Sequence, residues 1–274
     1  MRFIRMFVSF VLLCGGVACS SGASENSVIT RAEDTGKLTI GIRFDQPGLA
    51  ERTVDGRQVG FDVDVARFVA GELGVKAKDI TWRETSAATR ENDLTSGAVD
   101  LIVAAYSITD RRKQVVAFAG PYFTTGQDLL VRLSSTDITG PEVLNGRKLC
   151  SVTGSTPAQK VKDRFAQAVQ LVEYPRYPDC VTALLAGQVD AVTTDAAILA
   201  GYAAQNPELL RLVGHPFSTE RYGIGLRLGD PEGQAKLNDA IRKMISTGVW
   251  LNSLKANIGP SGYQLPPPPE VNEK

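Results

Sequence analysis

The chain contains many arginines, whose side chains can bind an acid, and Arg43, Arg90 and Arg112 are three of them. Arg43 follows an apolar run at 38–42 that predicts a strand, and Arg90 and Arg112 fall on expected helices. A guanidinium group binds a carboxylate through parallel N–H groups, so charge and shape both match. The alternative for Arg90 and Arg112 is an ordinary solvated position on a helix. The arginines therefore indicate an acidic ligand only if the fold brings them to one cleft.

Two further residues could complete such a site. The four residues from Thr156 have the form of a helix start, with threonine at the N-cap, proline at the first helical position and glutamine at the third. Free backbone N–H groups at a helix start bind anions. Asp195 follows an expected strand at 191–194, where ligands of α/β proteins collect, and a carboxylate there suits an ammonium group. The alternative for Thr156 is a structural cap alone, and Asp195 could likewise cap the helix expected after it.

The rest of the composition excludes several kinds of chemistry. The single histidine, His215, disfavours histidine-rich zinc sites and triads with a histidine base. The four cysteines contain no C-x-x-C pair, which disfavours zinc ribbons and thioredoxin-like redox chemistry. Thirty basic and thirty acidic residues cancel, so no net field favours nucleic acid. We therefore expect no metal, no cofactor and no nucleic-acid partner.

Short apolar runs alternate with amphipathic segments from residue 37 onward, which predicts an α/β fold. The expected strands are 38–42, 101–105, 129–133, 148–152 and 191–194. The expected helices are 61–73, one from 156, 180–186 and a long stretch at 231–258. The four prolines at 266–269 predict a disordered tail over 261–274.

One pattern occurs twice. A segment at 94–102 resembles a segment at 185–192, and their glycines, Gly97 and Gly187, are 90 residues apart. Each segment ends a helix at a glycine cap, turns through Val-Asp and enters a buried strand. Two such units predict two lobes of like topology, with a small-ligand cleft between them.

The N-terminus predicts export. Residues 1–18 read as a signal peptide, because two arginines precede an apolar run at 6–13 that is too short to span a membrane. Cys19 follows small residues and resembles the lipidated cysteine of a lipobox, although Gly16 stands where leucine is usual. We expect a lipid on Cys19, a flexible linker at 19–36 and anchoring to the outer face of the cytoplasmic membrane. The alternative is an ordinary signal peptide cleaved beside a cysteine.

Export leaves Cys150 and Cys180 as the cysteines free to pair. In an oxidising compartment the simplest expectation is a disulfide between them. Closing a loop of about 30 residues would stabilise the fold by roughly 3–4 kcal/mol in the chain-entropy model. The alternative is two buried free thiols.

Several motifs carry a family resemblance. They are the runs at 60–66, 97–100, 107–112 and 118–122, together with the fourteen residues at 150–163. With these motifs the chain resembles the family 3 extracellular solute-binding proteins, the amino-acid receptors of ABC importers, over about residues 37–258. The fourteen-residue run is similar to that of the glutamate-binding lipoproteins within this family.

The resemblance implies a two-lobed fold of the periplasmic-binding-protein type II, with the ligand in the cleft and two hinge crossings near 131–134 and 222–227. The implied boundaries are 37–131 with 225–260 for lobe 1, 132–224 for an inserted lobe 2, and 261–274 for the proline-rich tail. Ligand binding closes such lobes by a hinge motion.

The resemblance also implies a ligand set. Arg112 and Thr156 would bind the α-carboxylate, and Asp195 the ammonium group. Arg90, seven residues before Gly97, would bind a side-chain carboxylate, with Arg43 as a second cation. The complete implied set is Arg43, Arg90, Ala105, Ser107, Arg112, Thr156 and Asp195. The roles of Phe44, Asp45, Gln46 and Tyr106 stay open.

The implied function is a non-catalytic receptor that captures L-glutamate and delivers it to a permease–ATPase complex. We expect a monomer that contacts the membrane through its lipid only. Two distal cations disfavour lysine and arginine by like-charge repulsion, and glutamine is the alternative ligand. A cyclic-acid dehydratase would need an acid–base pair in the cleft that the sequence does not offer. A sensory domain is disfavoured because no membrane-spanning segment follows residue 258.

Overall fold

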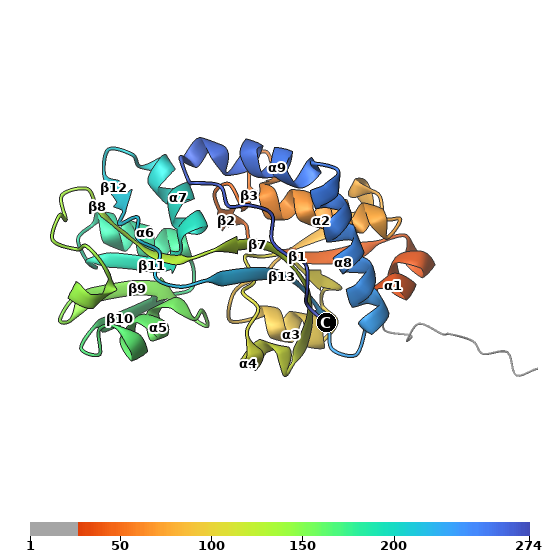
Figure 1. Ribbon diagram of the computed structural model, residues 1–274, viewed down its shortest axis with the longest axis horizontal. Coiled ribbons are helices and arrows are strands. Elements are labelled where there is room, and N and C mark those ends of the chain that lie inside the picture. The colour runs from red at the N-terminus through yellow and green to blue at the C-terminus, as the bar shows by residue number, and fades with distance from the viewer. Residues whose placement is uncertain (1–26) are drawn as a thin grey trace, which may run out of the picture.

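The computed structural model describes residues 27–274 and shows two lobes, each built on one five-stranded sheet (Figure 1). The predicted signal peptide and Cys19 lie outside the described residues. No helix in the described part of the chain is both long and apolar enough to cross a membrane. The two-lobed α/β architecture confirms the expected fold class.

The sheet of the first lobe has the strand order β5-β1-β6-β13-β7. Its strands are β1 (Leu38–Ile42), β5 (Ile80–Glu84), β6 (Leu101–Ile102), β7 (Val116–Thr125) and β13 (Glu220–Arg227). A small sheet beside it contains β2 (Asp45–Gln46), β3 (Ala50–Arg52) and β4 (Gln58–Val59). Because β1 pairs in parallel with both β5 and β6, these three strands end at the same edge of the sheet, where α/β ligands bind.

The helices of the first lobe are α1 (Val28–Thr35), α2 (Phe61–Glu72), α3 (Arg90–Thr95), α4 (Asp110–Lys113), α8 (Pro231–Ser246) and α9 (Val249–Asn257). In α2 the apolar residues Phe61, Val65 and Val69 recur every fourth position and are fully buried, which fixes one face against the core. Phe61 packs edge-on against Trp250 of α9, with ring centroids 5.9 Å apart.

The second lobe has the strand order β10-β9-β11-β8-β12. Its strands are β8 (Gln127–Arg132), β9 (Lys148–Val152), β10 (Gln170–Tyr174), β11 (Ala191–Asp195) and β12 (Leu210–Leu212), and its helices are α5 (Pro157–Arg164), α6 (Tyr177–Leu185) and α7 (Ala196–Gln205). Short 3-10 turns at Ala77–Asp79, Pro141–Leu144 and Gly259–Ser261 complete the described elements.

The internal repeat lies at matching places in the two lobes. Gly97 after α3 and Gly187 after α6 both take left-handed conformations, with φ of 75° and 72°. Asp100 then accepts a hydrogen bond from the amide of Thr39, and Asp190 accepts one from the amide of Lys148. Each aspartate thus ties the start of its own strand to the neighbouring parallel strand, which is why the same sequence pattern recurs.

The chain changes lobe at different residues from those expected. β7 ends at Thr125 and β8 begins at Gln127, so the first crossing falls at Gly126 rather than near 131–134. From Gln127 onward β8 pairs with β11 of the second lobe. On the return, Glu220 already pairs with Thr125 of β7. The expected boundaries at 131/132 and 224/225 are therefore displaced, because the chain passes from β7 to β8 through the single residue Gly126, with no longer loop between the strands.

The linker expected at 19–36 is shorter than predicted, because α1 occupies its last part. Ser27 caps α1 by accepting a hydrogen bond from the amide of Ile29, and its hydroxyl donates to Asp230 at 2.8 Å. The same aspartate accepts from the amide of Val28. This anchor joins residues about 200 positions apart in the sequence, so local patterns do not reveal it.

The helical stretch expected at 231–258 is confirmed, but the disordered tail expected at 261–274 is wrong. The stretch at 231–258 is two helices rather than one, since Gly248 between α8 and α9 is left-handed with φ of 76°. The tail at 261–274 packs against the fold. Val271 is buried, and the amides of Asn272 and Glu273 each donate to the carbonyl of Gly120 at 3.0 Å. The proline run instead carries the chain across the first lobe.

Candidate functional site

All of the predicted site residues line one pocket between the lobes. The first lobe supplies Arg43, Arg90, Ala105, Ser107 and Arg112, and the second lobe supplies Thr156 and Asp195. Further lining residues are Gln46, Ala87, Ala104, Val152, Ser155, Pro157, Tyr177, Thr194 and Ile198. Of these further residues, Ala87, Ala104 and Ile198 have small or apolar side chains that give no chemical signal in the sequence, and Tyr177 was not singled out.

Arg112 is held by its own loop. It lies on α4, is 1% exposed, and donates from Nη1 to the carbonyl oxygen of Ser107 at 2.7 Å. Its Nε lies 3.3 Å from a carboxylate oxygen of Glu91, an ion pair without hydrogen-bond alignment. Nη2 has no hydrogen-bond partner within the described residues. The fork is thus fixed on one side and free to bind a carboxylate on the other.

Arg90 is a buried cation without a counterion. It opens α3, is 6% exposed, and lies 4.0 Å from the centroid of the Tyr106 ring. Its single hydrogen bond, to the carbonyl of Ala104, is long at 3.4 Å, and its Nε is unpartnered. Among residues 27–274 no carboxylate lies within 4.0 Å of it. Burial first, and then the charge of Arg112, lower the pKa of Arg90 to about 9.

Arg43 differs from Arg90 because its charge is already neutralised. It follows β1 and donates to both oxygens of Asp45, at 2.9 and 2.8 Å. Burial alone would lower the pKa of Arg43, but the hydrogen bond and the charge of Asp45 raise it. Gln46, with an unpartnered Oε1, lines the pocket, whereas Asp45 does not. The question left open between Asp45 and Gln46 is thereby answered.

Thr156 stands at the N-cap of α5, but its side chain makes no capping hydrogen bond. Gln159, at the third position of the helix, donates a hydrogen bond to Asp163. The predicted helix start at Thr156 is confirmed, but its hydroxyl does not serve as the cap. The Thr156 hydroxyl and the first amides of α5 remain available to an anion in the pocket.

Asp195 ends β11 and precedes α7 without capping it. One of its oxygens accepts a hydrogen bond from the Tyr222 hydroxyl at 2.6 Å, and the carboxylate has no cation partner among the described residues. Burial, followed by the nearby charge of Glu220, raises the pKa of Asp195 to about 7. An ammonium group would remove the cost of this buried negative charge.

The backbone conformation of Ala105 is held by Asp62, a residue that the sequence analysis did not identify as part of the site. The φ of Ala105, 45°, is in the left-handed region, which L-residues rarely adopt, and its amide donates to the fully buried Asp62 at 2.8 Å. The other Asp62 oxygen accepts from the Tyr122 hydroxyl at 2.9 Å. β6 is therefore shorter than the expected strand at 101–105, since the chain leaves the sheet to place Ala105 at the pocket.

Direct contacts between the lobes surround the pocket. The Tyr202 hydroxyl of α7 donates to the carbonyl oxygen of Asp45, and Arg176 lies 4.0 Å from the Asp45 carboxylate. Gly201 of α7 approaches Pro47 so closely that a Cβ would lie 2.4 Å from its carbonyl oxygen. The structure is therefore a closed form, in which Asp45 receives contacts from both lobes.

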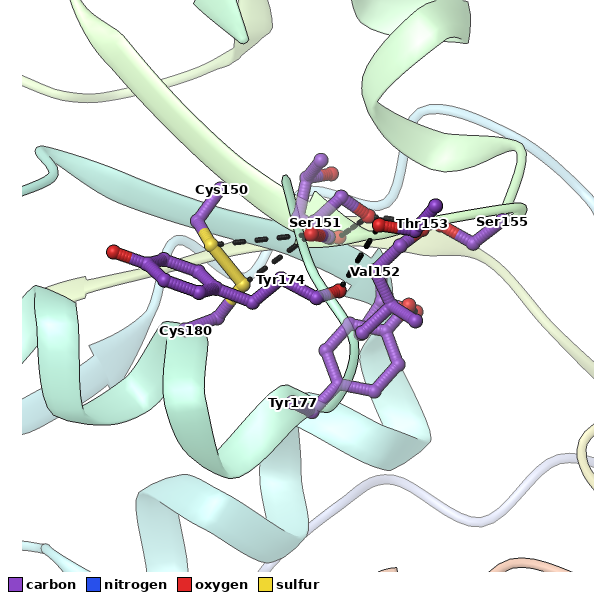
Figure 2. Close-up of a disulfide and its surroundings, with 10 residues drawn as sticks. Cys150, Ser151, Val152, Thr153, Ser155, Tyr174, Tyr177 and Cys180 are labelled. Carbon is purple, nitrogen blue, oxygen red and sulfur yellow. Dashed lines mark hydrogen bonds between the residues drawn. A yellow bond between two sulfur atoms is a disulfide. The ribbon is translucent and has the colours of Figure 1, made fainter. Parts of the chain in front are cut away.

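The disulfide braces the second lobe's part of the site (Figure 2). Cys150 on β9 and Cys180 on α6 are bonded, with their Cα atoms 5.7 Å apart, as expected. Between them and the pocket, Ser151 donates to the carbonyl of Thr193 and lies in hydrogen-bond contact with Ser155. The bond thus fixes the strand that leads into the Thr156 helix start. Among the described residues, no group of three metal-ligating side chains could hold a metal.

Comparisons with known proteins agree on the kind of molecule. Residues 38–259 match the model of the bacterial extracellular solute-binding proteins, family 3. Over 262 residues the chain is 44% identical to the glutamate-binding protein GluB of Corynebacterium efficiens, covering 92% of this chain and 89% of that protein. It is 32% identical over 255 residues to the ABC transporter glutamine-binding protein GlnH of Bacillus subtilis, covering 91% and 93%.

A solved structure supports the fold. An ancestral arginine-binding protein bound to glutamine superposes with a TM-score of 0.76 at 32% identity, covering 82% of this chain and 98% of that chain. Similar chains thus bind amino acids with different side chains, so the charges of this pocket have to distinguish among them.

Proposed function

The chain belongs to family 3 of the bacterial extracellular solute-binding proteins, and from this we propose that it captures L-glutamate and delivers it to an ABC importer. Glutamate carries two carboxylates and one ammonium group. The pocket offers Arg112 with Thr156 for one carboxylate, Arg90 for the other, and Asp195 for the ammonium group. Arg43 is already paired with Asp45 and Arg112 lies beside Glu91, so Arg90 is the lining cation that has no carboxylate within 4.0 Å among the described residues.

The observation that carries the assignment is the unpaired Arg90. A buried guanidinium without a counterion is costly, and a second carboxylate on the ligand removes that cost. Arg43 is a weaker candidate for this role because Asp45 already satisfies it. A lysine or arginine ligand would bring a further cation beside Arg90 and is disfavoured.

Glutamine is the second candidate ligand. Gln46 lines the pocket, and its Oε1 has no hydrogen-bond partner among the described residues. The side-chain amide N–H₂ of a glutamine ligand could donate to this oxygen. A glutamine side chain, however, would leave the charge of Arg90 uncompensated. We therefore place glutamate ahead of glutamine by the energy of one buried charge pair.

Catalysis is not part of the proposal. Asp195 is the one acidic side chain lining the pocket within the described residues, and it is assigned to the ammonium group. A dehydratase would need a further acid–base group at the reacting atoms. Incubation with a cyclic acid should therefore leave its concentration unchanged.

The ligand assignment is tested by isothermal titration calorimetry on the chain that begins after Cys19. L-glutamate should bind with a lower Kd than L-glutamine, L-aspartate or L-arginine, and the protein should be monomeric in the same buffer. Tighter binding of glutamine than of glutamate would overturn the assignment while leaving the amino-acid receptor class intact.

The anchor is a separate proposal, since Cys19 lies outside the described residues. A lipid on Cys19 would hold the receptor at the outer face of the cytoplasmic membrane beside its permease and ATPase partners. Cys19→Ser should release the protein from membranes or block its processing. A Cys19→Ser protein that is processed and still membrane-bound would rule out the lipid.

A further inference from the structure

The last part of the chain runs back to the ligand site. After α9 the chain crosses over β7 and β13, the two strands that join the lobes (Figure 1). On this route the Tyr263 hydroxyl lies 2.8 Å from the hydroxyl of Thr125, the last residue of β7. Asn272 and Glu273 then both bind the carbonyl of Gly120 in β7.

Glu273 is a buried carboxylate at the end of this route, between two cations whose side chains are 42% and 39% exposed. Its side chain is 6% exposed and pairs with Lys113 of α4 at 2.7 Å and with Arg221 of β13 at 2.9 Å. Asn272 adds a second hydrogen bond to Arg221 at 2.7 Å. Asn238 of α8 donates to the backbone carbonyl of Glu273, which holds the end of the tail against α8.

Both partners of Glu273 adjoin the residues that bind the proposed ligand. Lys113 directly follows Arg112 on the short helix α4. Arg221 lies beside the loop that carries Ser107, because its carbonyl accepts from the amide of Ile108 at 2.8 Å and Ser107 bridges Tyr222. One carboxylate therefore joins the helix of Arg112 to the strand that supports Ser107.

From this cluster we propose that Glu273 is a positioning residue for the carboxylate-binding corner formed by Ser107 and Arg112. The inference rests on the proposed function. α4 is one turn long and has little stability of its own, so an ion pair at its last residue restrains the orientation of the whole turn. Glu273 also offsets the mutual repulsion of Lys113 and Arg221, which would otherwise separate α4 from β13.

The tail offers a matched control for this proposal. Glu270 belongs to the same segment, is exposed, and makes no ion pair within the described residues. Glu273→Gln and Glu270→Gln therefore remove the same charge from the same tail. Lys113→Met and the double variant Lys113→Met with Glu273→Gln complete a double-mutant cycle.

The Kd of L-glutamate is measured by calorimetry at a temperature at which every variant is folded by circular dichroism. We expect Glu273→Gln to raise the Kd about fivefold and Glu270→Gln to change it less than about twofold. The double variant should be no weaker than Glu273→Gln alone, because that substitution already breaks the contact that Lys113→Met removes. A purely structural role would lower the melting temperature without this pattern in the Kd.

Two results would overturn the proposal: equal Kd values for Glu273→Gln and Glu270→Gln, or effects of Glu273→Gln and Lys113→Met that add. Neither result touches the assignment of glutamate, which depends on the wild-type protein. If the wild-type protein instead binds L-glutamine more tightly, the same cycle measured with L-glutamine tests Glu273, since both amino acids present an α-carboxylate to Arg112.

Discussion

The two lobes bring opposite charges to the same pocket. The first lobe contributes the arginines Arg43, Arg90 and Arg112, whereas the second lobe contributes one carboxylate, Asp195, and the start of α5. Arg90 and Asp195 are each buried without an ion-pair partner within the described residues. In the closed form both charges are costly unless a ligand stands between them.

This difference explains how a ligand can drive closure. In an open form water would solvate Arg90 and Asp195 separately, and closing the lobes without a ligand would remove that water. An acidic amino acid replaces the lost solvation on both sides at once, so it binds the closed form more tightly than the open form. In the proposed complex the arginines of the first lobe bind the two carboxylates, while the second lobe adds Thr156 to one of them and binds the ammonium group through Asp195.

The largest effect is expected at Arg112, on the cationic side. Arg112→Ala should leave the α-carboxylate of the ligand without its fork and cost about 2–5 kcal/mol of binding free energy. Calorimetry should then detect no binding at concentrations that saturate the wild-type protein. Arg111→Ala is the control, because Arg111 is adjacent, exposed and makes no ion pair among the described residues. Similar losses for both variants would remove Arg112 from the site.

A smaller effect on the Kd of glutamate is expected from changes in pH, which act through Asp195 of the second lobe. In the closed form without a ligand, burial raises the pKa of Asp195 to about 7, so below that pH a proton competes with the ammonium group for this carboxylate. The Kd of glutamate should therefore rise as the pH falls from 8 to 6, by at most about tenfold. Asp195→Asn should bind weakly at both values, with a ratio near one. A wild-type Kd that does not change over this range would contradict the role of Asp195.

The smallest effect is expected where the lobes touch outside the pocket. Tyr202→Phe removes the hydrogen bond to Asp45 that joins the lobes in the closed form. Loss of one such bond should raise the dissociation rate of glutamate about threefold in stopped-flow measurements, with little change in the association rate. Tyr174→Phe, whose hydroxyl makes no hydrogen bond within the described residues, is the control. An equal dissociation rate for the two variants would show that this contact does not hold the closed form.

Much of the site could be predicted because its residues belong to short motifs with fixed spacing. Arg112 and Ser107 share one loop, and Thr156 and Asp195 stand at element ends that periodicity locates within a few residues. The repeat around Gly97 and Gly187 could be predicted for the same reason, since glycine caps and Val-Asp turns are local.

The remaining features depend on contacts between distant residues. The pairing of Arg43 with Asp45 decides which arginine is free, but the sequence equally permits either to be unpaired. The pattern at Thr156 is the same whether its hydroxyl caps the helix or faces a ligand. The tail is held to the fold by Glu273, whose partner Lys113 lies 160 positions away in the sequence. A contact between residues so far apart leaves no local pattern, and the proline run taken by itself suggested disorder.

The most direct test of the account compares two ligands on two variants. Arg90→Ala should weaken glutamate about a hundredfold and glutamine only a few-fold, because glutamate alone loses a buried charge partner. Arg43→Ala should not change the ratio of the two Kd values in this way, since Asp45 already neutralises Arg43. Calorimetry on the wild-type protein and both variants gives that ratio. We predict that the ratio of the glutamine Kd to the glutamate Kd falls strongly in Arg90→Ala and stays near the wild-type value in Arg43→Ala. An unchanged ratio in Arg90→Ala would contradict the claim that an unpaired buried arginine selects the acidic ligand.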